Sequence, residues 1–281
     1  MEIYREKREL AAKNPGKAER IRRYGSMRFK DYVTEWKAGQ RDLSPGSLRS
    51  LDSMLNNHLY PALASRRMNA FDFKVVEGFL QTTGRGGVGL AAQASAFNWL
   101  KSILLDAHRL GLYDEHPIQG VKPPRYRPGR AVIPSPLQLR GIRDAGDETF
   151  RLLVDLMTGC GMRNGEAAAV NINNIVADDV YRITEQVHHT TKRYAALKAR
   201  KVGDYRDVPL PVMVREGIER FAEQHGTTDS GYLLLHPKYP SRPLPPHWLP
   251  YHWQKIKKAG LAPIPGAWWS TASGTSSRRT A

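Results

Sequence analysis

This sequence has little cysteine and no long apolar run. It also lacks histidine and tyrosine near its C-terminal end. Its 281 residues include one cysteine, Cys160, which excludes a disulfide framework and a cysteine-based zinc site. No stretch of about 18 apolar residues offers a membrane span, and the N-terminus lacks the apolar core of a signal peptide. These absences predict a cytoplasmic protein with no membrane partner. No histidine follows His252, and no tyrosine follows Tyr251.

Motifs for common cofactors are missing as well. The sequence has no ATP-binding loop, no cluster of metal ligands and no hydrolase nucleophile elbow. His188 and His189 are adjacent, and neighbouring residues of a strand face opposite ways, so the two cannot easily share one metal ion. Cys160 has no evident neighbouring base and is expected to be a small packed residue. We therefore expect no metal, no cofactor and no small-molecule substrate.

Positive charge is what the chain has in excess. It contains 43 Lys and Arg against 27 Asp and Glu, which gives a formal net charge of +16. Such a surplus favours a polyanionic partner, because each neutralised phosphate releases condensed counterions. The charge by itself leaves open a non-enzymatic basic protein that binds DNA or RNA. The length suggests about two domains, and 41% apolar residues suffice for ordinary cores.

The stretch from Thr158 to Val170 holds the densest chemical signal. An apolar helical pattern runs into a glycine-rich turn, and Arg163 stands at the head of a short alanine-rich helix. Glycines permit a tight turn, and free N–H groups at a helix start, together with a guanidinium, favour a phosphate. An ordinary corner between two helices with a surface arginine is the alternative.

Two motifs together resemble the phage-type integrases, the tyrosine recombinases. The first is Thr-Gly-Cys-Gly-Met-Arg-Asn-Gly-Glu-Ala at 158–167, and the second is Leu-Lys-Ala-Arg-Lys-Val-Gly-Asp-Tyr-Arg-Asp-Val-Pro-Leu-Pro at 197–211. The resemblance extends over roughly residues 27–262. It implies that Arg163 clamps the scissile phosphate and that Lys198, on a β-hairpin, is the general acid. Lys201, three residues on, is the rival for the lysine role. Double-stranded DNA is the implied partner, with self-association on DNA.

The resemblance also implies the fold class and the domains. The expected fold is mainly α with a small β-sheet: an N-terminal four-helix core-binding domain, SAM-like, and an α+β tyrosine-recombinase catalytic domain that is incomplete at its C-terminus. The boundaries fall at 1–26 for a basic N-terminal arm, 27–116 for the core-binding domain, 117–136 for a proline-rich basic linker, 137–262 for the partial catalytic domain and 263–281 for an aberrant tail. The arm is either a solvated segment on DNA or a disordered leader.

Helical spacing predicts the elements of the core-binding domain. Ser44-Pro45 should cap a helix that continues until Pro61 stops it, and two further helices are expected over 71–80 and 90–110. Basic side chains of this domain and of the linker are candidate DNA contacts, although a single surface Lys or Arg is more often solvated. The candidates are Arg49, Arg66, Arg67, Lys74, Lys101, Arg125 and Arg127.

In the second domain, strands are expected over 179–187, 194–199 and 205–210. The last two should form a hairpin with Gly203-Asp204 as its turn, and Lys198 should lie on that hairpin. We also expect the apolar stripe of Val154, Leu156 and Ile218 to lack partners, because the family's last helices are missing. That loss would favour marginal stability and aggregation.

The family's second motif, His-x-Leu-Arg-His, and its tyrosine nucleophile should follow residue 262, and neither is present. Residues 262–281 show no periodicity. With permitted codons, a frame shifted by one base over 267–281 encodes Met-Val-Val-His-Gly-Leu-Arg-His-Phe-Phe-Ala-Ser-Asn-Cys. The hypothesis is a one-base frameshift near codon 265, which resequencing of the coding DNA tests. The chain as written is therefore expected to be catalytically inactive, keeping Arg163 and Lys198 as a remnant of the catalytic set.

Overall fold

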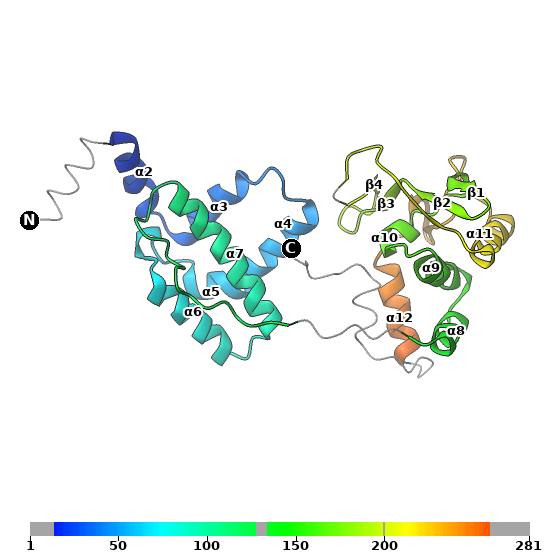
Figure 1. Ribbon diagram of the computed structural model, residues 1–281, viewed down its shortest axis with the longest axis horizontal. Coiled ribbons are helices and arrows are strands. Elements are labelled where there is room, and N and C mark those ends of the chain that lie inside the picture. Colours follow the sequence, from blue (N-terminus) through cyan, green and yellow to red (C-terminus); the bar gives the residue numbers. More distant parts are fainter. Residues whose placement is uncertain (1–13, 128–133, 199, 259–281) are drawn as a thin grey trace, which may run out of the picture. The chain divides into compact units, whose positions relative to one another are not determined.

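The computed structural model describes residues 14–127, 134–198 and 200–258, in two compact units, Met1–Pro128 and Gly129–Ala281. The fold is mainly α-helical with small antiparallel sheets, as the sequence predicts (Figure 1). Among the described residues, no helix is long and apolar enough to cross a membrane. The proposed frameshift and the tail at 263–281 lie outside the described residues.

The first unit is helical. Its elements are α2 (Pro15–Gly25), α3 (Phe29–Ala38), α4 (Pro45–Met54), the π-helical turn η1 (Leu55–Leu59), α5 (Tyr60–Leu63), the 3-10 turn η2 (Met68–Ala70), α6 (Phe73–Arg85) and α7 (Leu90–Arg109). Ser44 caps α4 as expected, accepting a hydrogen bond from the Ser47 N–H. Apolar positions of all the long helices from α3 to α7 meet in one core, which includes Phe29, Leu51, Phe79 and Leu100.

The helix that begins at Pro45 does not stop at Pro61. The helix of α4 widens into the π-helical turn η1, in which the Tyr60 N–H bonds to the Leu55 carbonyl, and α5 then begins with Pro61 in its first turn. Proline lacks an N–H donor and its ring disturbs a regular α-helical turn, and the π-helical turn directly before Pro61 accommodates this disturbance within the continuing helix. The expected stop is therefore wrong, and the run of apolar residues continues to the buried Leu63.

Helix α2 packs against the helical unit. Lys17 pairs with Asp114 at 3.3 Å, Arg20 Nε donates to the Leu110 carbonyl at 3.1 Å, and Tyr24 meets Tyr32 edge to face at 5.8 Å. The described part of the expected arm is thus a docked helix and not a free segment. Residues 1–13 lie outside the described residues.

The start of the expected linker also packs on this unit. Val121 is buried in the helical core, and Ile118 packs against it. The boundary between the two compact units falls after Pro128. Helix α8 (Pro136–Asp144) then begins at a proline, and the Ser135 hydroxyl accepts a hydrogen bond from the Gln138 N–H as its cap.

The second unit combines helices with short antiparallel strands. After α8 come α9 (Glu148–Gly159), α10 (Asn164–Ala167), η3 (Ile172–Asn174), β1 (Ile175–Ala177), β2 (Val180–Ile183), β3 (Glu185–Val187), β4 (Tyr194–Ala196), β5 (Arg206–Pro209), α11 (Val212–His225), β6 (Leu235–His236), β7 (Tyr239–Pro243) and α12 (Trp248–Lys258). The sheets have the orders β1-β2-β5, β3-β4 and β6-β7.

The predicted hairpin between residues 194–199 and 205–210 is wrong. β4 pairs with β3, placing Tyr194 opposite Val187, and β5 pairs with β2, placing Arg206 opposite Ile183. The extended stretch breaks at Thr184, so its first half takes β5 as partner and its second half takes β4. Consequently Lys198 lies in the turn after β4, within the connection to β5.

Helix α9 runs through the centre of the second core. Val154, Leu156 and Ile218 are 4%, 0% and 0% exposed, and they share one apolar cluster with α11 and α12. Leu249 and Trp253 of α12 belong to that cluster. The expectation that this stripe lacks partners is therefore wrong, because α11 and α12 cover α9.

Candidate nucleic-acid interface

The turn after α9 directs Arg163 outward. Cys160 and Met162 point into the core, with 4% and 3% exposure, while Gly161 adopts the left-handed conformation at φ +62°. That conformation costs a residue with a Cβ atom roughly 1–2 kcal/mol, so glycine suits this corner. Arg163 follows as the N-cap residue of α10, and its side chain is 56% exposed.

Glu166 is the buried centre of the site. Its side chain is 1% exposed and accepts three hydrogen bonds: from the Arg163 N–H at 2.8 Å, from Arg163 Nη1 at 2.7 Å and from Arg206 Nη2 at 2.7 Å. The carboxylate therefore occupies the start of α10, which is four residues long. Glu166 accepts the backbone N–H of Arg163, so an acidic side chain already lies at the helix start where the sequence predicts a phosphate, and the Arg163 guanidinium remains exposed.

These contacts keep Glu166 ionised. Burial penalises the carboxylate, yet the hydrogen bonds from Arg163 and Arg206 outweigh it and hold the pKa of Glu166 below its usual value. A buried carboxylate between two guanidiniums is a rigid mount, because short charge-assisted bonds fix both partners.

Arg206 is a site residue that the sequence analysis missed. It lies on β5, where Val208 is buried, and it shares the inward face of the strand because side chains alternate. A cation on an inward strand position requires a buried partner. The alternation Arg206, Val208, Leu210 was the signal that could have found it.

Two close contacts hold α10 in place. Asn164 Nδ2 donates to the Pro246 carbonyl at 2.7 Å, linking α10 to the segment before α12. Gly165 faces β3 so closely that a Cβ atom there would lie 2.8 Å from the Val187 carbonyl oxygen. The sequence Asn164-Gly165 is thus explained by packing.

The loop between β4 and β5 carries the predicted lysines. Leu197 is buried at 4% exposure and anchors the loop start, and Lys198 follows it as an exposed residue. Lys201 is also exposed; its backbone N–H bonds to Asp204 Oδ2 at 2.9 Å within the turn. Arg200 Nη1 donates to the Tyr205 carbonyl at 2.7 Å, which closes the loop.

The return strand is fixed by a second arginine pair. Arg182 forks onto both oxygens of Asp207 at 2.9 and 3.0 Å, and its guanidinium lies over the Tyr205 ring, 4.0 Å from the centroid. The loop therefore presents exposed cations between two tied ends, an arrangement that suits a polyanion's backbone.

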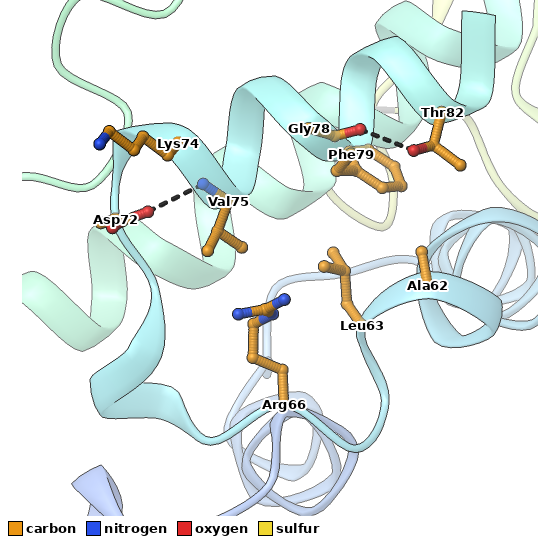
Figure 2. A pocket seen from close by; sticks show the side chains of 9 residues that line it. All are labelled: Ala62, Leu63, Arg66, Asp72, Lys74, Val75, Gly78, Phe79 and Thr82. Carbon is orange, nitrogen blue, oxygen red and sulfur yellow. Dashed lines mark hydrogen bonds between the residues drawn. The ribbon is translucent and has the colours of Figure 1, made fainter. Parts of the chain in front are cut away.

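In the helical unit, two of the predicted contacts share a groove. Arg66 and Lys74 line an open cavity of about 350 Å³ between α5 and α6, over the apolar side chains of Leu63, Val75 and Phe79. Figure 2 shows the Arg66 guanidinium reaching into this space. The other predicted contacts are exposed on separate elements: Arg49 on α4, Arg67 before η2, Lys101 on α7, and Arg125 and Arg127 in the extended segment after the helices.

The residues set aside in the sequence analysis have structural roles. His188 Nδ1 accepts hydrogen bonds from the N–H groups of Thr190 and Thr191, both at 3.3 Å, as in a turn. Burial raises the pKa of the Cys160 thiol to about 11, as expected for a packed cysteine and not a nucleophile. Within the described ranges, no three His, Cys, Asp or Glu residues gather as metal ligands.

Comparison with solved structures identifies the fold. A lambda integrase tetramer bound to a Holliday junction matches with a TM-score of 0.63 and 13% identity, over 83% of this chain and 64% of that chain. The Tn1549 transposon integrase in complex with transposon right end DNA matches with a TM-score of 0.68 and 13% identity, over 85% of this chain and 80% of that chain. A lambda integrase(75-356) dimer bound to a COC' core site matches with a TM-score of 0.65 and 14% identity, over 85% of this chain and 81% of that chain.

Comparisons by sequence give no match, either to a protein-family model or to a curated protein. The chain spans slightly less than two thirds of the lambda integrase chain in the tetramer. At these identities the likeness concerns the fold. The chain therefore has the fold of the lambda and Tn1549 integrases, in agreement with the resemblance of its two motifs to the tyrosine recombinases.

Proposed function

We propose that this chain binds double-stranded DNA, with Arg163 as the central phosphate contact. The observation that carries the proposal is the Arg163 guanidinium, 56% exposed and mounted on the buried Glu166. A guanidinium offers five donors, and among the described residues it spends one Nη1 bond on Glu166, so the rest of the fork is open to a phosphate. The matched integrase structures are DNA complexes, which supports the same partner here.

Lys198 is the proposed second contact. It directly follows the buried Leu197, so its backbone is held close to the core, whereas Lys201 lies in the exposed turn. A lysine held near a phosphate donates a proton to an alkoxide leaving group in the family's chemistry. Exchanging each lysine for alanine ranks them: Lys198→Ala should weaken DNA binding more than Lys201→Ala.

The helical unit contributes sequence-independent contacts. Arg49, Arg66, Arg67, Lys74, Lys101, Arg125 and Arg127 are exposed cations, and the formal charge of +16 favours a polyanion throughout. Self-association on DNA belongs to the same proposal. Phosphate contacts of this kind position a duplex without selecting its sequence.

We further propose that the chain, as printed, binds without cutting. Covalent cleavage in the family needs a tyrosine nucleophile, a second arginine in the phosphate clamp and a histidine that handles the nucleophile's proton. The printed sequence has no Tyr after Tyr251 and no His after His252. A nicked suicide duplex should therefore give no covalent protein–DNA adduct on a denaturing gel, and an adduct would contradict this part of the proposal.

Fluorescence anisotropy with a labelled duplex tests the binding itself. The apparent affinity should fall steeply with salt, and Arg163→Gln should weaken binding and reduce the slope of log K against log salt by about one. Arg220→Gln is the matched control, since Arg220 is exposed on α11 and forms no ion pair among the described residues. Stronger binding to single-stranded or duplex RNA than to duplex DNA would favour the alternative of a basic RNA-binding protein.

A further inference from the structure

The inference concerns Arg206 and rests on the proposed function. Three charged groups form the mount of the site: the Glu166 carboxylate and the guanidiniums of Arg163 and Arg206. Their formal charges sum to +1. Because Arg206 bonds to Oε2 and Arg163 bonds through Nη1 to Oε1, each guanidinium has its own carboxylate oxygen.

Without Arg206 the net charge of the site would fall from +1 to zero. Arg163 alone would face the buried carboxylate, and that pair would present no net charge to an approaching phosphate. The carboxylate would also lose a 2.7 Å hydrogen bond in an environment where water cannot replace it. The attraction between Arg163 and a phosphate would then be offset by repulsion from Glu166.

Arg206 is not itself neutralised by the neighbouring acid. Asp207 is the next residue, but it faces the other side of β5 and is engaged by both arms of Arg182. Arg206 is 25% exposed, and its Nη2 also donates to the Gly161 carbonyl at 3.2 Å. One guanidinium group thus holds both the carboxylate and the turn that precedes Arg163.

We propose that Arg206 is a positioning residue for the DNA phosphate at Arg163: by neutralising Glu166 and bracing Gly161, it leaves the charge of Arg163 available to the ligand. The role is indirect. Arg206 acts through Glu166, and its proposed contribution is an electrostatic one that a lysine at the same position would partly supply.

The test compares variants by the sum of charges at the mount. Arg206→Gln and Arg163→Gln both bring the sum to zero, and each should weaken duplex binding about tenfold and lower the salt slope by about one. The double variant Glu166→Gln/Arg206→Gln restores the sum to +1 and should recover most of the slope. Arg206→Lys keeps the charge sum and should keep most of the salt slope. Arg220→Gln removes one positive charge from the exposed surface of α11 and is the control.

Circular dichroism melts of every variant show which remain folded. If Arg206→Gln unfolds, Arg206→Lys and the double variant still decide the matter, because they keep the charge sum by different means. A structural role alone would not restore the salt slope on removal of Glu166 together with Arg206.

The outcomes separate the two proposals. If the wild-type chain fails to bind duplex DNA, the proposed function fails. If the wild-type binds and Arg163→Gln loses affinity while Arg206→Gln behaves like Arg220→Gln, the role of Arg206 is overturned alone. It is also overturned if the double variant binds as weakly as Arg206→Gln, since neutralisation of Glu166 would then not be its contribution.

Discussion

Asn164 and Pro246 are joined by a 2.7 Å hydrogen bond from the side-chain amide of one to the carbonyl of the other, across 82 positions of sequence. Asn164 is 5% exposed and directly follows Arg163. The bond therefore ties the corner that carries Arg163 to the segment that enters α12. A buried carbonyl must be paired, and this asparagine is the group that pairs it.

Replacing Asn164 by alanine should destabilise the second unit by about 1–3 kcal/mol, because the Pro246 carbonyl would be left buried and unpaired. Hydrogen exchange measured on peptides from α10 and α12 should show faster exchange in both. Gln254→Ala, on the exposed side of α12, is the matched control and should leave both peptides unchanged. Faster exchange in α12 of the control, or none in Asn164→Ala, would contradict the link.

Two glycines of the second unit should respond oppositely to alanine. At Gly165 a Cβ atom would lie 2.8 Å from the Val187 carbonyl oxygen, so Gly165→Ala must push α10 away from β3 and should cost about 1–3 kcal/mol. At Gly217, within α11, a Cβ atom would meet nothing within 4 Å, so Gly217→Ala should stabilise by about 0.5–1 kcal/mol through helix propensity.

Urea unfolding of both glycine variants, compared with the wild-type chain, measures the difference. The critical result is the sign of the change in the free energy of unfolding, which should be a decrease for Gly165→Ala and an increase for Gly217→Ala. Equal effects at the two positions would show that backbone propensity, and not the α10–β3 contact, governs Gly165.

The helices followed from local patterns, and the strand pairing did not. Ser44-Pro45 and the spacing of apolar residues predicted helix starts well, since caps and periodicity act within one element. The partner of β4 depends on the break at Thr184, and the sequence predicted one continuous strand over 179–187. The prediction that Pro61 ends the helix was wrong for a similar reason. The π-helical turn before it lets the helix continue past a residue that has no N–H donor.

For the candidate site, the sequence predicted Arg163 and Lys198 but not their surroundings. Glu166 stands three residues after Arg163, a spacing that brings both side chains to one side of a helical turn. Arg206 is 40 positions away, and only the pairing of β5 with β2 brings it to Glu166. Contacts over such separations depend on the assembled core.

Helix α12 should be essential to the second core. Trp253 is 3% exposed and packs in the same cluster as α9 and α11, so Trp253→Ala should cost about 3–5 kcal/mol. Tyr251, two residues earlier, is 58% exposed, and Tyr251→Ala should change stability by less than about 0.5 kcal/mol. Thermal unfolding of the two variants compares them directly, and similar melting temperatures would mean that α12 does not cover α9.

The helical unit should lose stability in mild acid through His116. Burial, with smaller contributions from His108 and Lys101, lowers the pKa of His116 below its ordinary 6.5. Its Nδ1 accepts a hydrogen bond from the Ile118 N–H at 3.1 Å, and the His108 ring lies 5.1 Å away. The folded unit therefore favours neutral His116.

The sign follows from proton uptake. As pH falls through 6.5, the unfolded chain binds a proton at this residue before the folded chain does, so the free energy of unfolding decreases; the loss stops below the folded pKa. His116→Gln keeps an acceptor for Ile118 and cannot titrate. Melting temperatures measured above and below pH 6.5 should thus fall less in the variant than in the wild-type chain. Parallel falls in both proteins would assign the acid sensitivity to other groups.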